Sequence, residues 1–468
     1  MKPGDDVPAD APAPDVLARV AIPAFVFRMT STMPKCLPAL LAIFTFSAAT
    51  NAADFLIHDG DRVVFLGDSI TEQKLYTTYI EAYTLTRHPN WKLTFRNVGW
   101  GGDTSWLRQR AHPDEAKLFA ANEADQQKMV EDSVGRGLER DVLPLHPTVV
   151  TVKFGMNDHA YQAFRKDIFG AYTRSQTEIN KVLTANGARV AFLTPQPIEE
   201  RRSDPDKDIR NQSLHNFSVG LRDVATKTGA AYVDQFEPYL NLMMSARAAD
   251  PKAFIGGGDA VHPGPSGQTL MAWLVLKGLG ATAPVSRVEI NAPGNSVTAE
   301  NCHVSQLQIA NGTVRFDRLD EALPMPIDER GEAALALAPV LDELSRYDVR
   351  VTGLAPGNYE VTIDGETAGK VDADVLAKGW NLSNAGGPIT KQAREVLSLV
   401  FRKNDMYFNR WRNVQLYNFP GWAQGPDVEN GREKELKRLD GQIAEVEAKL
   451  DAARKPVLHH FVVKPVAQ

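Results

Sequence analysis

The sequence predicts an α/β fold in which a parallel β-sheet carries helices on both faces. From Phe55 to about Thr282, short apolar runs alternate with longer amphipathic stretches. Alternation of this kind is typical of strands that are joined by helices. The strand-like runs lie at residues 62–66, 92–97, 148–154, 189–194 and 231–234, and the clearest amphipathic stretches lie at 167–185 and 213–228.

The pattern of the chain changes near residue 283. Residues 283–375 hold short, β-branched runs with turn signals between them, such as Ala355-Pro356-Gly357-Asn358, and this predicts a small antiparallel module. Residues 376–468 are helical in pattern. Five apolar residues recur there at three-four spacing: Leu436, Leu439, Ile443, Val446 and Leu450. We expect a helix with this apolar stripe to pack on the body of the protein.

With 468 residues, the chain is long enough for two or three domains. Its apolar fraction of 43% and its charged fraction of 24% are ordinary for a globular protein. The net charge of −6 argues against nucleic acid as the main partner, because phosphate binding needs a basic surface. No apolar run reaches the ~18–20 residues of a membrane-spanning helix.

Residues 1–53 are predicted to be an N-terminal extension and a signal peptide, with a short buried helix as the alternative. Met33 is followed by a lysine, by an apolar run at 37–46 and by small residues that end at Ala52 and Ala53. This order describes a secretory signal peptide that is cleaved near Ala52 or Ala53. Cys302 would then be the single cysteine of the mature chain, so no intrachain disulfide can form. Export without disulfides suits a bacterial periplasm or exterior.

Four short motifs occur in fixed order in the predicted first domain, residues 54–282. The first strand runs into Gly67-Asp68-Ser69, and three motifs follow at 97–103 (Asn-Val-Gly-Trp-Gly-Gly-Asp), 155–158 (Gly-Met-Asn-Asp) and 259–263 (Asp-Ala-Val-His-Pro). The first three motifs each come after a predicted strand. Because ligands of an open parallel sheet bind beyond the carboxyl ends of its strands, the sequence predicts that these motifs meet in one crevice.

The residue types in these motifs are the ones that acyl transfer needs. Ser69 can present its hydroxyl at the start of a helix, near the positive end of the helix dipole. The backbone N–H groups of Ser69 and Gly102 and the Asn157 amide are candidate donors to an oxyanion. Asp259 can hold one nitrogen of His262 while the other nitrogen faces the serine, as in serine hydrolases. The Gly-x-Ser-x-Gly elbow of another hydrolase class is absent, because position 71 is threonine.

As an ordered set, the motifs resemble those of the SGNH (GDSL-type) hydrolase family over roughly residues 55–279. The resemblance implies a three-layer α/β/α sandwich with a flavodoxin-like parallel sheet. It implies Ser69 as the nucleophile, His262 as the base and Asp259 as the residue that orients the base. Ser69, Gly102 and Asn157 become the oxyanion donors. It also implies no metal or organic cofactor, and substrates that are esters or thioesters of lipids, aryl groups or acetylated carbohydrates.

Four residues beside the motifs are candidates for substrate binding: Trp100, Asp103, His159 and Tyr161. For each of them another role is the alternative. Trp100 could serve in buried packing, Asp103 could orient the glycine loop, and His159 and Tyr161 could lie on the surface away from a ligand.

On these observations, we expect a secreted enzyme that removes O-acetyl groups from carbohydrate, because export, an acidic chain and an added β-module suit a polymer substrate. A lipid or aryl esterase, or a lysophospholipase, of the same fold is the first alternative. A non-catalytic carbohydrate-binding protein is the second, and the intact set of motif residues argues against it. The β-module is expected to shape access to the crevice or to bind glycan, and the sequence leaves the oligomeric state open.

Overall fold

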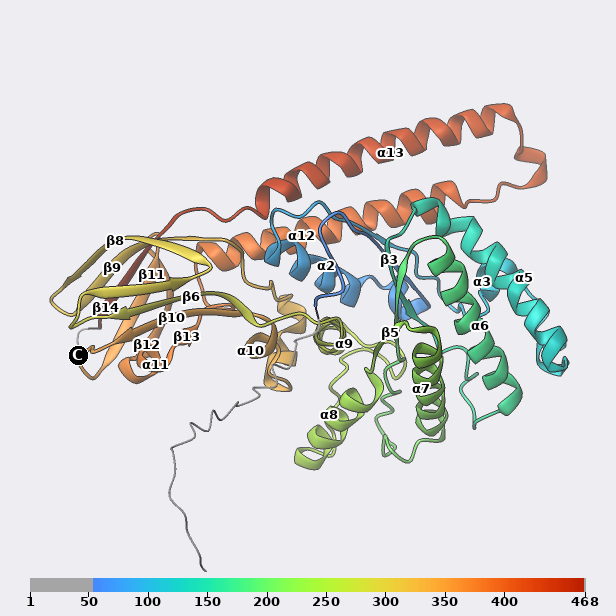
Figure 1. Ribbon diagram of the computed structural model, residues 1–468, viewed down its shortest axis with the longest axis horizontal. Coiled ribbons are helices and arrows are strands. Elements are labelled where there is room, and N and C mark those ends of the chain that lie inside the picture. The colour runs from blue at the N-terminus through green and yellow to red at the C-terminus, as the bar shows by residue number, and fades with distance from the viewer. Residues whose placement is uncertain (1–53, 467–468) are drawn as a thin grey trace, which may run out of the picture. The chain divides into compact units, whose positions relative to one another are not determined.

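The computed structural model describes residues 54–466, so the predicted signal peptide lies outside the described residues. Five strands form a sheet in which all neighbours are parallel, in the order β2-β1-β3-β4-β5. The strands are β1 (Arg62–Gly67), β2 (Thr94–Asn97), β3 (Val149–Lys153), β4 (Arg189–Leu193) and β5 (Ala231–Val233). This is the strand order of a flavodoxin-like sheet. The predicted α/β fold is therefore confirmed (Figure 1).

Helices cover both faces of this sheet. One face packs against α2 (Leu75–Arg87), α8 (Phe236–Ala249) and α9 (Pro265–Gly278), and the other against α5 (Glu123–Asp141), α6 (Lys166–Ala185) and α7 (Ile209–Thr228). The residues of β1 alternate between the two cores. Val63 and Phe65 join the first core, and Val64 and Leu66 join the second. Because both faces of β1 are buried, its sequence is a continuous apolar run. Three short helices complete the domain: α1 (Ser69–Glu72), α3 (Arg108–Ala111) and α4 (Glu115–Ala120).

Two further sheets make up the C-terminal module. One has the order β13-β10-β6-β7 and the other the order β12-β11-β14-β9-β8. All pairs are antiparallel except β6 with β10. The strands are β6 (Pro284–Asn291), β7 (Ser296–Glu300), β8 (Cys302–Ala310), β9 (Thr313–Asp320), β10 (Arg346–Thr352), β11 (Asn358–Ile363), β12 (Glu366–Asp372), β13 (Trp380–Asn381) and β14 (His459–Pro465). Two short helices, α10 (Val340–Leu344) and α11 (Ala373–Lys378), accompany them.

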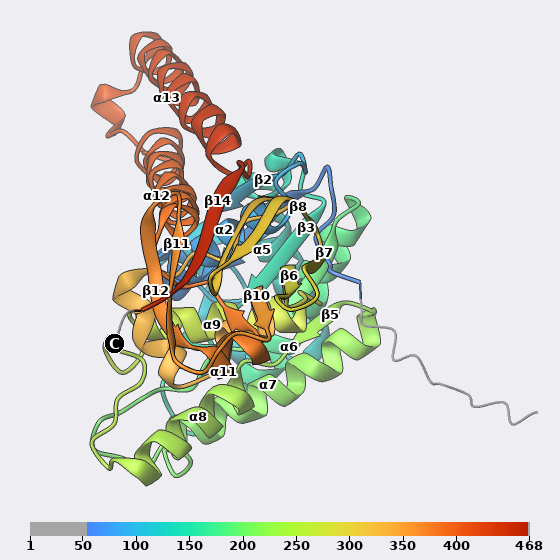
Figure 2. The ribbon, with the colours of Figure 1, turned by 90° about the vertical axis from the view of Figure 1, so that its left-hand side faces the viewer.

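The last strand, β14, is a feature that the sequence analysis did not predict. It lies between β11 and β9 in the middle of the five-stranded sheet (Figure 2). Its inward residues His459, Phe461 and Val463 are buried. Only three alternating buried positions mark this strand, which is too short a pattern to separate it from the helical tail by sequence. The C-terminal end of the predicted helical region, 376–468, is therefore a strand of the β-module.

The helical tail consists of α12 (Pro388–Phe408) and α13 (Pro426–Ala453), which lie side by side in both views (Figures 1 and 2). Four residues of the predicted stripe are buried, Leu439, Ile443, Val446 and Leu450, and Leu436 is half-buried. The stripe packs mainly on α12, and α12 packs on α2 of the first domain. The tail thus covers the sheet-supporting helices from outside.

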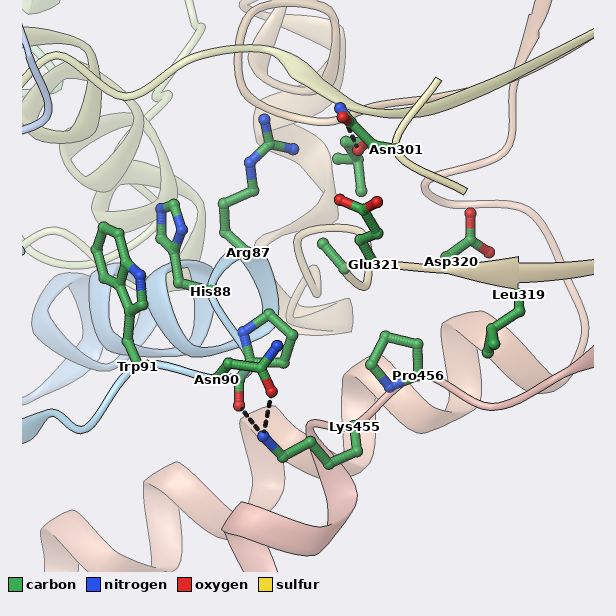
Figure 3. Close-up of a pocket in the computed structure, with 13 residues that line it drawn as sticks. Arg87, His88, Asn90, Trp91, Asn301, Leu319, Asp320, Glu321, Lys455 and Pro456 are labelled. Carbon is green, nitrogen blue, oxygen red and sulfur yellow. Dashed lines mark hydrogen bonds between the residues drawn. The ribbon is translucent and has the colours of Figure 1, made fainter. Parts of the chain in front are cut away.

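The first domain and the β-module share one hydrophobic core. Buried residues from α2 and α9 pack in the same cluster as residues from β6, β9, β10 and β14. A polar cavity of about 560 Å³ lies at the seam, between the segment 87–91, the end of β9 and the connector at Lys455 (Figure 3). Lys455 Nζ donates to the carbonyl of Pro89 at 2.5 Å and to Oδ1 of Asn90 at 2.7 Å. The described residues belong to one compact unit. Among them, no helix is long and apolar enough to cross a membrane.

A buried ion pair fixes α12 to the first domain and gives a test of this packing. Lys403 Nζ lies 2.6 Å from Oε1 of Glu81, and the two side chains are 1% and 3% exposed. We expect Lys403→Met to lower the free energy of unfolding by about 3–5 kcal/mol, because it leaves a buried carboxylate without its cation. Arg438→Met, which removes an exposed partner of Glu435, should leave it nearly unchanged, because an exposed ion pair contributes little to stability. Urea denaturation of both variants checks this, and equal losses would contradict the packing described.

Candidate active site

Ser69, His262 and Asp259 form a continuous chain of hydrogen bonds at the carboxyl edge of the parallel sheet. Ser69 is the first residue of α1, two residues after β1 ends. Its Oγ lies 2.9 Å from Nε2 of His262. Nδ1 of His262 lies 3.0 Å from Oδ2 and 3.2 Å from Oδ1 of Asp259. The structure therefore brings the three residues together in the order that nucleophilic catalysis requires.

The loop that carries Asp259 and His262 is shaped by the Asp259 carboxylate. Oδ1 accepts hydrogen bonds from the backbone N–H groups of Val261 at 2.8 Å and of His262 at 2.7 Å. Burial alone would raise the pKa of Asp259, but these donors and the imidazole lower the pKa below its usual value. The side chain of Asp259 is 67% exposed and that of His262 is 34% exposed. The crevice is therefore open to solvent on this side.

Three hydrogen-bond donors of the motifs are candidates for an oxyanion site. The N–H of Ser69 stands at the first position of α1, where a backbone donor has no acceptor within the helix. Gly102 has a φ of 77°, which glycine adopts at little cost. Asn157 donates through Nδ2 to the carbonyl of Asp103 at 2.9 Å, next to Gly102. Its Oδ1 accepts a bond from the Tyr161 hydroxyl at 3.1 Å, which fixes the amide orientation and leaves one amide N–H for a ligand.

The glycine loop lies directly against α1. Asn97 donates through Nδ2 to the carbonyl of Thr71 at 2.7 Å and accepts through Oδ1 from the N–H of Gly99 at 2.8 Å. A side chain at Gly99 would place its Cβ 2.3 Å from the backbone nitrogen of Glu72, so the approach requires glycine. The motif at 97–103 thus keeps the Gly102 donor close to the helix that begins at Ser69.

Asp158 connects its own motif, 155–158, to Ser105, which follows the glycine loop. Its Oδ1 accepts from the N–H of Ser105 at 2.8 Å, and its Oδ2 accepts from the N–H of Gly155 at 2.9 Å. The side chain is buried, and burial raises the pKa of Asp158 to about 6, although the two N–H donors oppose this rise. Asp158 therefore holds the Asn157 loop and the glycine loop in one arrangement.

Two residues that the sequence analysis considered for substrate binding are buried. Asp103 is 0% exposed and pairs with buried Arg110, which also lies 3.1 Å from Oδ1 of Asp141. His159 is 2% exposed, and burial lowers its pKa to about 4, so its imidazole is neutral near pH 7. Each residue supports a loop of the site, which is the alternative that the sequence analysis left open for Asp103.

Comparison with known proteins agrees with this geometry. Residues 65–270 match the model of the GDSL-like lipase/acylhydrolase family, and this range includes all four motifs. Residues 65–270 are a GDSL-like lipase/acylhydrolase domain. The comparison with curated proteins gives no match.

One solved structure is similar to nearly the whole chain. A gut microbial diltiazem-metabolizing enzyme is 25% identical at a TM-score of 0.71, over 88% of this chain and 98% of that chain. The likeness therefore extends beyond the GDSL-like domain into the module and tail. Two further structures are similar over 48% of this chain, each at a TM-score of 0.37 and 20% identity. One is an acetylxylan esterase from Geobacillus stearothermophilus, of which 96% is covered. The other is an alpha/beta hydrolase enzyme from the metagenome of Lake Arreo, Spain, of which 98% is covered. At this TM-score they say nothing further about this chain.

Tyr161 and Trp100 are the substrate-binding candidates with exposed surface in the GDSL-like domain. Tyr161 is 41% exposed, and its hydroxyl contacts Asn157. Trp100 is half-buried and directly precedes the glycine pair of the loop. The Arg412 guanidinium lies 3.4 Å from the centroid of the Trp100 ring, and Trp411 meets that ring edge-on at 5.8 Å. Trp100 is therefore held by the C-terminal tail.

Arg412 is a residue of the site region that sequence reasoning did not interpret. It lies in the π-helical turn η3 (Asn409–Gln415), which continues α12. Its Nη2 lies 3.6 Å from Oε1 of Glu72 in α1. π-Helical turns frequently occur at functional sites, but no spacing in the sequence connects residue 412 with α1 or with Trp100. Only the folding of the tail onto the GDSL-like domain brings them together.

The surroundings of the site hold no metal-binding cluster among the described residues. Cavities of about 250–790 Å³ occur in the described part of the chain, and Ser69, Gly102, Asn157 and His262 line none of these five. No group of three or more His, Cys, Asp and Glu side chains within residues 54–466 is placed to hold a metal ion. The exposure of the Asp259 and His262 side chains leaves this side of the triad accessible to solvent.

The raised pKa of Asp158 predicts a specific dependence of stability on pH. Between its usual value of 3.8 and about 6, the folded protein holds a proton on Asp158 that the unfolded chain has lost. Stability from this group is therefore fully present below pH 3.8 and is lost as the pH rises through 6, by on the order of 2–3 kcal/mol. In Asp158→Asn this contribution disappears.

Chemical denaturation at pH 4, 5, 6 and 7 measures the effect. The free energy of unfolding of the wild type minus that of Asp158→Asn should decrease as the pH rises from 4 to 7. A difference that does not vary with pH would show that Asp158 is not the group described.

Proposed function

We propose that the protein is an exported serine ester hydrolase that removes O-acetyl groups from carbohydrate. The observation that carries the proposal is the hydrogen-bond chain from Ser69 through His262 to Asp259, beside the donors of Gly102 and Asn157. A GDSL-like acylhydrolase acts on acylated substrates, and these residues supply the nucleophile, the base and the oxyanion contacts that such a reaction needs.

The first half of the proposed reaction forms an acyl-enzyme. Nε2 of His262 takes the proton of Ser69 Oγ while Oγ attacks the carbonyl carbon of the ester. The carbonyl oxygen becomes an oxyanion, which accepts hydrogen bonds from the N–H groups of Ser69 and Gly102 and from the amide of Asn157. Because the donors are already oriented, they stabilise the developing charge without reorganisation. His262 then gives its proton to the alcohol oxygen, which leaves as the acyl–oxygen bond breaks.

The second half releases the acid. His262 takes a proton from water as the water oxygen attacks the acyl carbon, and the same donors hold the second oxyanion. Collapse of this intermediate returns the proton to Oγ of Ser69. Asp259 accepts a hydrogen bond from Nδ1–H throughout, so it orients the imidazole and stabilises its protonated form.

The openness of the site supports a short acyl group on a bulky alcohol. A long acyl chain needs apolar surface to leave water, whereas the exposed side chains of Asp259, His262 and Tyr161 carry polar groups. The exposure of Asp259 and Tyr161 leaves room for a large alcohol beside Ser69. An acetylated sugar has both properties.

The similarity to a diltiazem-metabolizing enzyme favours a second candidate function. In this alternative the alcohol part is an aromatic, drug-like compound rather than a sugar. An assay with p-nitrophenyl acetate, butyrate and palmitate, an acetylated xylo-oligosaccharide and diltiazem separates the possibilities. The proposal expects acetate to be preferred over palmitate and the oligosaccharide to have the highest kcat/KM, and the opposite order in either comparison would contradict it.

The location of the enzyme is also part of the proposal. The charged start, apolar run and small residues at 33–53 support export to a bacterial periplasm or exterior. N-terminal sequencing of the exported protein should begin near Ala53 or Asp54. An intact Met1 on the protein from the soluble cytoplasm of its host would contradict export.

Substitution of the triad and of one oxyanion donor tests the mechanism. Ser69→Ala and His262→Ala should each lower kcat on the order of 10⁴-fold or more, because the first removes the nucleophile and the second removes the base that activates it. Asp259→Asn should cost less than His262→Ala, since only orientation is lost. Asn157→Ala should lower kcat by about 10²–10³-fold.

The matched control is Ser245→Ala, which changes an exposed serine of α8 and should leave kcat unchanged. Circular dichroism verifies that each variant is folded. Folded Ser69→Ala or His262→Ala protein with near wild-type kcat would exclude the serine-hydrolase mechanism, and activity absent from the wild type on every ester would favour a binding function.

A further inference from the structure

A lysine is buried directly beside the nucleophile strand. Lys153 is the last residue of β3 and pairs in register with Gly67, which is two residues before Ser69. Its side chain is 0% exposed. Lysine is almost never fully buried without a partner, because burial of its charge is costly. Within the described residues it has no carboxylate within 4.0 Å, and its hydrogen bond goes to Oε1 of Gln196 at 2.8 Å.

The charge that balances Lys153 is Asp68, the residue before Ser69. Asp68 is also 0% exposed, and its Oδ1 accepts from the N–H of Ile70 at the start of α1 at 3.0 Å. Its Oδ2 has no hydrogen-bond partner among the described residues. Burial raises the pKa of Asp68 and lowers that of Lys153, and the opposite charge of each residue counters the effect of burial on the other. The two opposite charges therefore offset part of the cost of burying each other, without a direct ion pair between them.

Gln196 connects Lys153 to the loop that carries His262. It is 0% exposed and follows β4. Its Nε2 donates to the carbonyl of Val261, the residue before His262, at 3.0 Å. Three residues later, the N–H of Glu199 donates to the carbonyl of Ala260 at 2.9 Å. The segment after β4 therefore holds the His262 loop through two hydrogen bonds.

The His262 loop needs this support because it has no regular structure of its own. Three consecutive glycines at 256–258 precede Asp259, and α9 begins only at Pro265. The position of His262 relative to Ser69 therefore depends on contacts from neighbouring segments. A displacement of about 1 Å at a reacting group can lower turnover by up to a hundredfold.

We propose that Lys153 is a positioning residue of the active site: it fixes Gln196, and Gln196 fixes the His262 loop relative to the strand end that carries Ser69. The proposal rests on the function proposed above, because it assigns Lys153 and Gln196 to the support of that mechanism. Neither side chain touches substrate.

The test compares Lys153→Met, Gln196→Met and the double variant. Methionine has a similar length and forms neither hydrogen bond. Each single variant should lower kcat on the order of tenfold to a hundredfold. KM should stay within about threefold, since the lost contacts are not made to substrate. Because the two residues act in series, the double variant should be no slower than the slower single variant.

Lys403→Met is the matched control, because Lys403 is another fully buried lysine but pairs with Glu81 in the α2–α12 contact. It should lose stability and keep kcat within about threefold of the wild type. Assays are run well below the melting temperature of each variant, with folding checked by circular dichroism. If Lys153→Met does not fold, Gln196→Met decides alone, since it removes no charge.

Two results would overturn the proposal. One is folded Gln196→Met protein with kcat within about threefold of the wild type. The other is kcat losses in the two single variants that add in the double variant, because independent effects would exclude a shared path. Failure of the proposed function looks different: the wild type itself would then not hydrolyse esters.

Discussion

The hydrogen bond between Ser69 and His262 joins residues that are 193 positions apart in the chain, and its two ends are held in different ways. Ser69 leaves a strand that pairs with β2 on one side and β3 on the other. The glycine loop and Asn157 follow those two neighbours at the same edge, so the sheet itself places Ser69, the glycine loop and the Asn157 loop together. His262 lies on a glycine-rich loop, which is linked to the sheet through the Lys153–Gln196 contact and the segment after β4.

Buried charges supply much of the remaining support. Arg110 joins Asp103 of the glycine loop to Asp141 of α5, and Asp158 joins its own motif to Ser105, just after the glycine loop, through backbone N–H groups. Removing a charge from water costs several kcal/mol, so each of these groups depends on its partner. The pKa of Asp158 is raised for the same reason, because burial disfavours the charged form of its carboxyl group. Such a site is rigid when every group is satisfied, and it is sensitive to the loss of one member.

The sequence predicted the layers of the fold and the convergence of the four motifs, because both depend on local patterns: strand–helix alternation, and residue types placed after strand ends. It did not predict β14 or the contact of Arg412 with Trp100, since these depend on where the tail folds back. Asp103 and His159 have side chains suited to binding, and the sequence left their supporting or surface roles open. The structure buries both. Burial of a residue within a motif is decided by neighbours that are distant in sequence.

Labelling of the nucleophile tests the central claim most directly. A fluorophosphonate reacts covalently with a serine that a neighbouring base has activated, and peptide mass spectrometry then locates the adduct. The account predicts one adduct, on the peptide that contains Ser69, and labelling that is slowed on the order of a hundredfold or more in folded His262→Ala protein. An adduct on another residue, or labelling of Ser69 at the same rate without His262, would contradict it.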